Sequence, residues 1–102
     1  MLSKLYFSMT ENTFFQALLQ AFSHTPTPSQ HTALQLFSSY LFDPEAAEKL
    51  FLLKGFAGTG KTSITNALIA ALPLISHHSV LLAPTGRAAK VMTFFTRQPA
   101  FT

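Results

Sequence analysis

This chain of 102 residues has no cysteine, few charged residues and no long apolar run. It has no cysteine, which excludes a disulfide scaffold, a thiolate metal site and a cysteine nucleophile. Charged residues make up only 11% of the sequence, against about 25% in an average globular protein. The longest apolar runs, such as residues 67–72, are far shorter than the ~20 residues that cross a bilayer. No apolar signal-peptide stretch follows the first residues, so we expect a cytoplasmic protein that does not enter a membrane.

Acidic residues are the scarcest charged class, and their distribution is uneven. All four lie in the first half of the chain, at Glu11, Asp43, Glu45 and Glu48. Residues 49–102 hold six basic residues and no acid. An all-basic half predicts an anionic ligand, such as a phosphate, a nucleotide or a nucleic acid. The same imbalance leaves that half without a carboxylate catalyst.

Apolar residues, in contrast, are plentiful. Hydrophobic residues make up 48% of the chain and eleven residues are Phe, which is ample for a core. Apolar spacing of three and four residues predicts four helices, over Thr13–Phe22, residues 27–41, Lys61–Leu72 and Arg87–Phe95. The first is Phe-rich and expected in the core, although a role in filling a partner's groove is the alternative. The second begins with Thr27 as N-cap, Pro28 in the first turn and Gln30 three residues after the cap.

Two continuous apolar runs, at residues 50–53 and 80–83, predict strands that are buried on both faces. The helix over residues 61–72 lies between them, so the strands would be parallel and joined by a right-handed crossover. The predicted fold class is therefore α/β, with a parallel β-α-β core that follows N-terminal helices.

Residues 55–62, Gly-Phe-Ala-Gly-Thr-Gly-Lys-Thr, match the phosphate-binding P-loop pattern G-x-x-x-x-G-K-[ST]. The loop N–H groups and the helix that starts at Lys61 would face the β-phosphate of ATP. Lys61, the expected catalytic residue, would bring a full positive charge to the β- and γ-phosphates, and the Thr62 hydroxyl would bind Mg²⁺. The alternative is an ordinary glycine-rich turn before a helix. The predicted nucleotide-binding residues of this segment are Gly55, Ala57, Gly58, Thr59, Gly60, Lys61, Thr62 and Ser63.

Three segments together resemble the RecD-like branch of superfamily-one DNA helicases. Residues 55–62 resemble motif I of that family, and Leu-Ala-Pro-Thr-Gly-Arg-Ala-Ala-Lys at residues 82–90 closely resembles its motif Ia. Thr-Pro-Ser-Gln at residues 27–30 resembles the family's upstream glutamine element. The resemblance implies that residues 26–102 are the N-terminal part of a RecA-like P-loop NTPase domain, and that residues 1–25 form a helical extension before it.

The resemblance also implies roles for the two segments outside the P-loop. Gln30 would recognise adenine, because an amide can donate to N7 and accept from the N6 amino group. The residues themselves leave open that Gln30 only completes a capping box with Thr27. The motif Ia loop would contact single-stranded DNA through backbone N–H groups, a hydroxyl and a guanidinium. Without the resemblance, the sequence of that loop favours a turn before an exposed arginine. The implied DNA-binding residues are Pro84, Thr85, Gly86 and Arg87.

Hydrolysis needs groups that this sequence does not supply. A P-loop ATPase uses an acid to hold Mg²⁺ through water, a residue that positions the attacking water and usually an arginine. The resemblance implies that later motifs and a second RecA-like domain provide them, since no Asp or Glu follows Glu48. We therefore expect a truncated piece of an ATP-dependent DNA helicase that, alone, binds nucleotide weakly, does not hydrolyse it and tends to self-associate. The alternatives are another P-loop ATPase of the AAA type, a small kinase, or a catalytically incomplete nucleotide-binding fragment.

Overall fold

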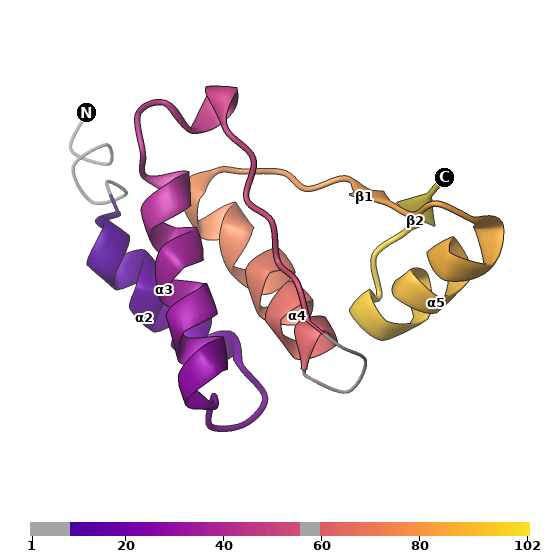
Figure 1. Ribbon diagram of the computed structural model, residues 1–102, viewed down its shortest axis with the longest axis horizontal. Coiled ribbons are helices and arrows are strands. Elements are labelled where there is room, and N and C mark those ends of the chain that lie inside the picture. The colour runs from indigo at the N-terminus through magenta and orange to yellow at the C-terminus, as the bar shows by residue number, and fades with distance from the viewer. Residues whose placement is uncertain (1–8, 56–59) are drawn as a thin grey trace.

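A computed structural model describes residues 9–55 and 60–102. Figure 1 shows α2, α3 and α4 gathered on one side, with α5 and the two short strands beyond α4. The four predicted helices are confirmed, with ends shifted by a residue or two. The elements in chain order are α2 (Glu11–Ala21), α3 (Pro28–Leu41), η1 (Ala46–Glu48), α4 (Lys61–Ala71), η2 (Leu72–Ile75), β1 (Leu81–Leu82), α5 (Gly86–Thr96) and β2 (Ala100–Phe101).

The apolar core lies among α2, α3 and α4. Phe14 and Leu18 from α2 are fully buried against Leu34 from α3 and Ala67 from α4. Each of the larger side chains contributes roughly 1.5–3 kcal/mol through burial. The Phe-rich first helix is thus a core helix, as expected from its spacing, and it packs directly against the helix that begins at the P-loop lysine.

Threonine begins three of the four helices. The hydroxyls of Thr10, Thr27 and Thr85 each accept a hydrogen bond from the backbone N–H three residues later, at 3.1–3.2 Å. These bonds satisfy N–H groups that a helix leaves unpaired in its first turn. Helix α4 differs, because it starts after Gly60 and no side chain among the described residues caps it.

The parallel strands are not the pair that the sequence predicts. Strand β1 pairs with β2, with Leu81 opposite Ala100 and Leu82 opposite Phe101, and α5 is the connection between them. The prediction of a strand at residues 50–53 is wrong, since no strand is assigned there. The described chain is therefore mostly helical, with a short two-stranded parallel sheet that includes only the second predicted strand.

Side-chain contacts explain where residues 50–53 lie instead. The Phe51 ring packs against Phe37 and Tyr40 of α3, with ring centroids 5.1 and 5.6 Å apart. The Tyr40 hydroxyl donates to the Lys49 carbonyl at 2.9 Å. These contacts hold the segment beside α3 and not in a sheet. Leu50, which no sheet covers among the described residues, is 96% exposed. Its apolar sequence has the pattern of a central strand, but a central strand needs a hydrogen-bonded neighbour on each side.

The second predicted strand is in place but is not buried on both faces, so that part of the prediction is also wrong. Val80 is 73% exposed and Leu82 66%, whereas Ala83 is buried. Within the part of the chain that the structure describes, β1 pairs with β2 alone, and the side chains of Val80 and Leu82 are left largely uncovered. No helix within residues 9–55 and 60–102 is long and apolar enough to cross a membrane.

Candidate nucleotide-binding site

The start of α4 carries the described half of the P-loop motif. Gly60 adopts φ +87°, a left-handed conformation that glycine tolerates far better than residues with a Cβ. The turn at Gly60 directs the chain into α4 at Lys61. Thr62 is exposed in the first turn, and Ser63 is half-buried beside it. The predicted contacts Ala57, Gly58 and Thr59 lie outside the described residues.

The backbone of the first turn fits an anion. Among the described residues, the first N–H of α4 with a backbone partner is that of Ile64, which donates to the Gly60 carbonyl at 3.2 Å. The N–H groups before it form the positive end of the helix dipole, and no side chain among the described residues caps them. A phosphate oxygen is a suitable acceptor for such groups.

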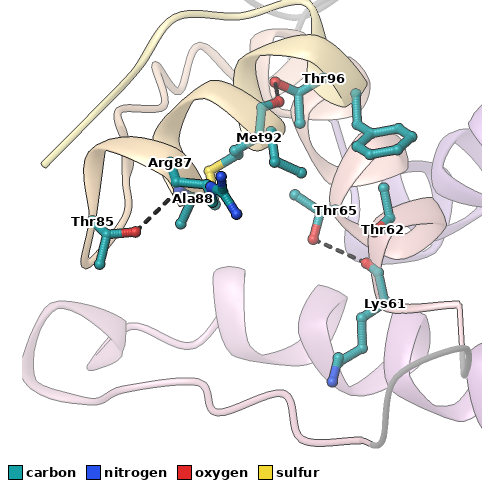
Figure 2. Close-up of a pocket in the computed structure, with 10 residues that line it drawn as sticks. Lys61, Thr62, Thr65, Thr85, Arg87, Ala88, Met92 and Thr96 are labelled. Atoms are coloured by element: carbon teal, nitrogen blue, oxygen red, sulfur yellow. Dashed lines mark hydrogen bonds between the residues drawn. The ribbon is translucent and has the colours of Figure 1, made fainter.

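Lys61 contacts the other described end of the motif. Its ammonium donates a hydrogen bond to the carbonyl oxygen of Gly55. Figure 2 shows this side chain directed away from α5. It lines a cavity of about 560 Å³ together with Leu53, Lys54 and Gly55, so the described residues that border this space include two cations and no acid.

A second cavity, of about 460 Å³, lies between the start of α4 and α5. Lys61 and Thr62 border it on one side and Thr85 and Arg87 on the other (Figure 2). The Arg87 side chain extends from α5 toward α4 in this view. The structure therefore brings residues of the two separate motifs to one cleft, which we call the α4–α5 cleft.

The loop after β1 presents the remaining predicted DNA-binding residues. Thr85 is the N-cap of α5 and accepts from the Ala88 N–H at 3.1 Å. Gly86 has open space where a Cβ would stand, with nothing within 4 Å. Pro84 and Arg87 are exposed. The loop follows the carboxyl end of a parallel strand, where α/β folds commonly present ligand-binding groups.

Gln30 lies at the junction of α3 and α4. Its Oε1 accepts from the Thr27 N–H at 2.9 Å, while the Thr27 hydroxyl accepts from the Gln30 N–H at 3.2 Å. The capping box predicted from the sequence is thus confirmed. Gln30 is only 6% exposed, and its Nε2 lies so close to Gly60 that a Cβ there would overlap it. Adenine recognition by Gln30 remains a prediction.

Two features of the site lack a signal that identifies them in the sequence. Val91, Met92 and Phe95 line the α4–α5 cleft. Their helical spacing is visible in the sequence, but that spacing is equally typical of a core face. The contact between Gln30 and Gly60 joins residues that are distant in the chain, and no short pattern encodes such a contact.

Comparison with known proteins gives one finding. The family model described as AAA domain matches residues 41–102, which include the P-loop motif, the α4–α5 cleft and the loop after β1. No curated protein and no solved structure matches the chain.

Proposed function

This chain belongs to the AAA domain family, and from that premise we propose that it is the ATP-binding segment of an ATP-dependent DNA helicase or translocase. The observation that carries the proposal is the α4–α5 cleft. Lys61 and Thr62 of the P-loop motif border the same cavity as Thr85 and Arg87 of the motif Ia loop. Packed elements that link two sites are one way in which coupling between a nucleotide and a nucleic acid can be carried, and this cleft places the two groups of residues on adjoining elements.

Each residue of the nucleotide half has a role that its position allows. The first-turn N–H groups of α4 bind phosphate oxygens, and the Lys61 ammonium adds a charge-assisted hydrogen bond. The exposed Thr62 hydroxyl and the oxygens of the nucleotide are the ligand type that Mg²⁺ prefers. Bound Mg²⁺ would neutralise charge on the phosphates.

The nucleic-acid half is the loop after β1. Arg87 is exposed and Thr85 has one hydroxyl proton beyond its capping bond, so both can donate to DNA phosphates. Such contacts position a single strand without reading its bases. Arg87 and Thr62 line the same cleft. A movement of the start of α4 when nucleotide binds would therefore change the surface beside α5, which carries the DNA-binding residues.

Hydrolysis by these residues alone is not part of the proposal. None of the four carboxylates of the chain lines either cavity beside Lys61. Glu11 instead accepts from the Ser39 hydroxyl at 2.8 Å, and Asp43 pairs with Lys49 at 2.6 Å. This observation favours a second candidate function, a catalytically incomplete nucleotide-binding module that binds its ligand without turnover.

The experiment that tests the nucleic-acid half is fluorescence anisotropy with labelled oligothymidine at low salt. We expect Arg87→Ala to weaken binding severalfold and to lower the slope of log affinity against log salt by about 0.7 for each phosphate that the variant no longer neutralises. Lys90→Ala is the matched control, since it removes the same charge from the same helix outside the cleft. Equal binding by the Arg87 variant and the wild type would remove the DNA half of the proposal.

A further inference from the structure

Helices α3 and α4 begin at the same end of the molecule (Figure 1). At this end the buried Gln30 side chain of α3 reaches the residue that starts α4, Gly60. The approach is so close that a methyl group at Gly60 would have to displace the Gln30 carboxamide. Gly60 is also the point where the P-loop motif enters its helix in a left-handed conformation.

Both ends of the Gln30 carboxamide face groups of the protein. The Oε1 atom accepts from the Thr27 N–H, which fixes the rotamer of the side chain relative to α3. The Nε2 end is directed at Gly60. A carboxamide that reads adenine must instead turn both atoms toward the base, with Oε1 accepting from N6 and Nε2 donating to N7.

We propose that Gln30 is a positioning residue for the triphosphate rather than a reader of the base. The capping box fixes Gln30 on α3, and Gln30 in turn holds Gly60 at the conformation from which the first-turn N–H groups of α4 face the phosphates. The base plays no part in this arrangement. The inference rests on the proposed nucleotide binding and specifies how one residue serves it.

The distinguishing consequence concerns ligands that differ in the base. A positioning residue contributes equally to the binding of ATP, GTP and inorganic tripolyphosphate, because all three present the same chain of phosphates to α4. A residue that reads the base contributes to the binding of ATP alone. Comparing how much affinity each ligand loses when Gln30 is substituted therefore separates the two roles.

The test is isothermal titration of the full 102-residue chain with the Mg²⁺ complexes of these three ligands. Gln30→Met keeps the volume of the side chain and removes its polar atoms. We expect it to lower the affinity for all three ligands by a similar factor of about ten. Thr10→Ala is the control for helix stability. It removes the equivalent N-cap hydroxyl of α2, which has no part in the arrangement of Gln30 and Gly60, so it should lower the melting temperature and leave the three affinities unchanged.

A second variant guards against a general loss of the helix start. Gln30→Glu keeps an acceptor for the Thr27 N–H and so preserves the capping box, but it replaces the Nε2 donor that faces Gly60. We expect a melting temperature near that of the wild type with weaker binding of all three ligands.

The contact itself is tested by a double-mutant cycle with Gly60→Ala. The loss of melting temperature caused by Gly60→Ala should be smaller in a Gln30→Ala background, where the obstructing carboxamide is gone. Additive losses would overturn the claim that Gln30 holds Gly60.

If Gln30→Met loses affinity for ATP but keeps its affinity for GTP and tripolyphosphate, the inference is overturned in favour of adenine recognition. If the variant binds all three ligands as the wild type does, the inference is also overturned, but the proposed function is not affected. A wild-type chain that binds none of the three would instead contradict the proposed function, and the inference would fall with it.

Discussion

The ammonium of Lys61 donates a hydrogen bond to the carbonyl oxygen of Gly55, which joins the lysine of the P-loop motif to its first glycine. The carbonyl is a neutral acceptor, and an anionic phosphate oxygen forms a stronger, charge-assisted bond with an ammonium. We therefore expect a bound triphosphate to compete successfully for Lys61. The lysine already lies beside the cavity that Gly55 and Lys54 border.

Thr85 should matter to stability through its cap as well as to DNA binding. Thr85→Ala removes the acceptor for the Ala88 N–H and should cost about 1 kcal/mol in the free energy of unfolding. Thr85→Ser keeps that acceptor and should remain within a few tenths of the wild-type value. Urea denaturation followed by circular dichroism measures both. If the two variants are equally destabilised, the cap is not the source of the stability.

A substitution at Gly86 should distinguish an effect on DNA binding from an effect on folding. Its Cβ position is open, so Gly86→Ala meets no obstacle and should leave the chain as stable or up to ~1 kcal/mol more stable, because alanine favours helices. The added methyl group would stand where we propose that the DNA backbone approaches, and affinity for oligothymidine should fall severalfold. Denaturation and anisotropy on one preparation give both values. A stable variant with full DNA affinity would contradict the proposed contact.

Asp43 gives the chain a pH dependence outside the site. The hydrogen bond from Lys49, at 2.6 Å, and the one from the Glu45 N–H, at 2.9 Å, lower the pKa of Asp43 below its ordinary value of 3.8. A lowered folded-state pKa adds stability that is present above pH 3.8 and is lost as pH falls through the lowered pKa. Asp43→Asn should therefore melt slightly below the wild type at about pH 6, and the difference should shrink as the pH approaches about 3.

The carboxylate is partly exposed, so the effect should be small and should decrease in high salt. A difference in melting temperature that stays constant across that range of pH would contradict the assigned charge interaction.

The helices could be predicted from the sequence because their signals are local. Thr27 and Gln30 are three residues apart, and each supplies its half of the capping box without help from the rest of the fold. The apolar spacing of α2 likewise places Phe14 and Leu18 on one face whatever that face meets.

The strands could not be predicted as well, because a strand depends on its neighbours. Residues 50–53 have the composition of a buried strand, yet Phe51 packs against Phe37 and Tyr40 instead of entering a sheet. Strand β2 is too short, at two residues after Pro99, for any periodic pattern to show. The position of β1 was predictable, but its exposure was not, since exposure is set by what covers the strand.

The same distinction holds for the site. The P-loop motif identifies Lys61 and Thr62 in the sequence, because the motif is continuous there. The contact of Gln30 with Gly60, and the cleft that places Arg87 opposite Thr62, arise from helix packing and have no linear pattern.

The central claim, that the start of α4 forms a phosphate-binding site, is tested most directly by titrating the chain with a fluorescent ATP analogue and Mg²⁺, beside Lys61→Ala. Lys61 makes no core contact among the described residues, so the variant should keep the circular dichroism spectrum of the wild type. We predict saturable binding by the wild type and at least a tenfold loss of affinity in the variant, the equivalent of about 1.4 kcal/mol. Identical titration curves for the two proteins would contradict the claim.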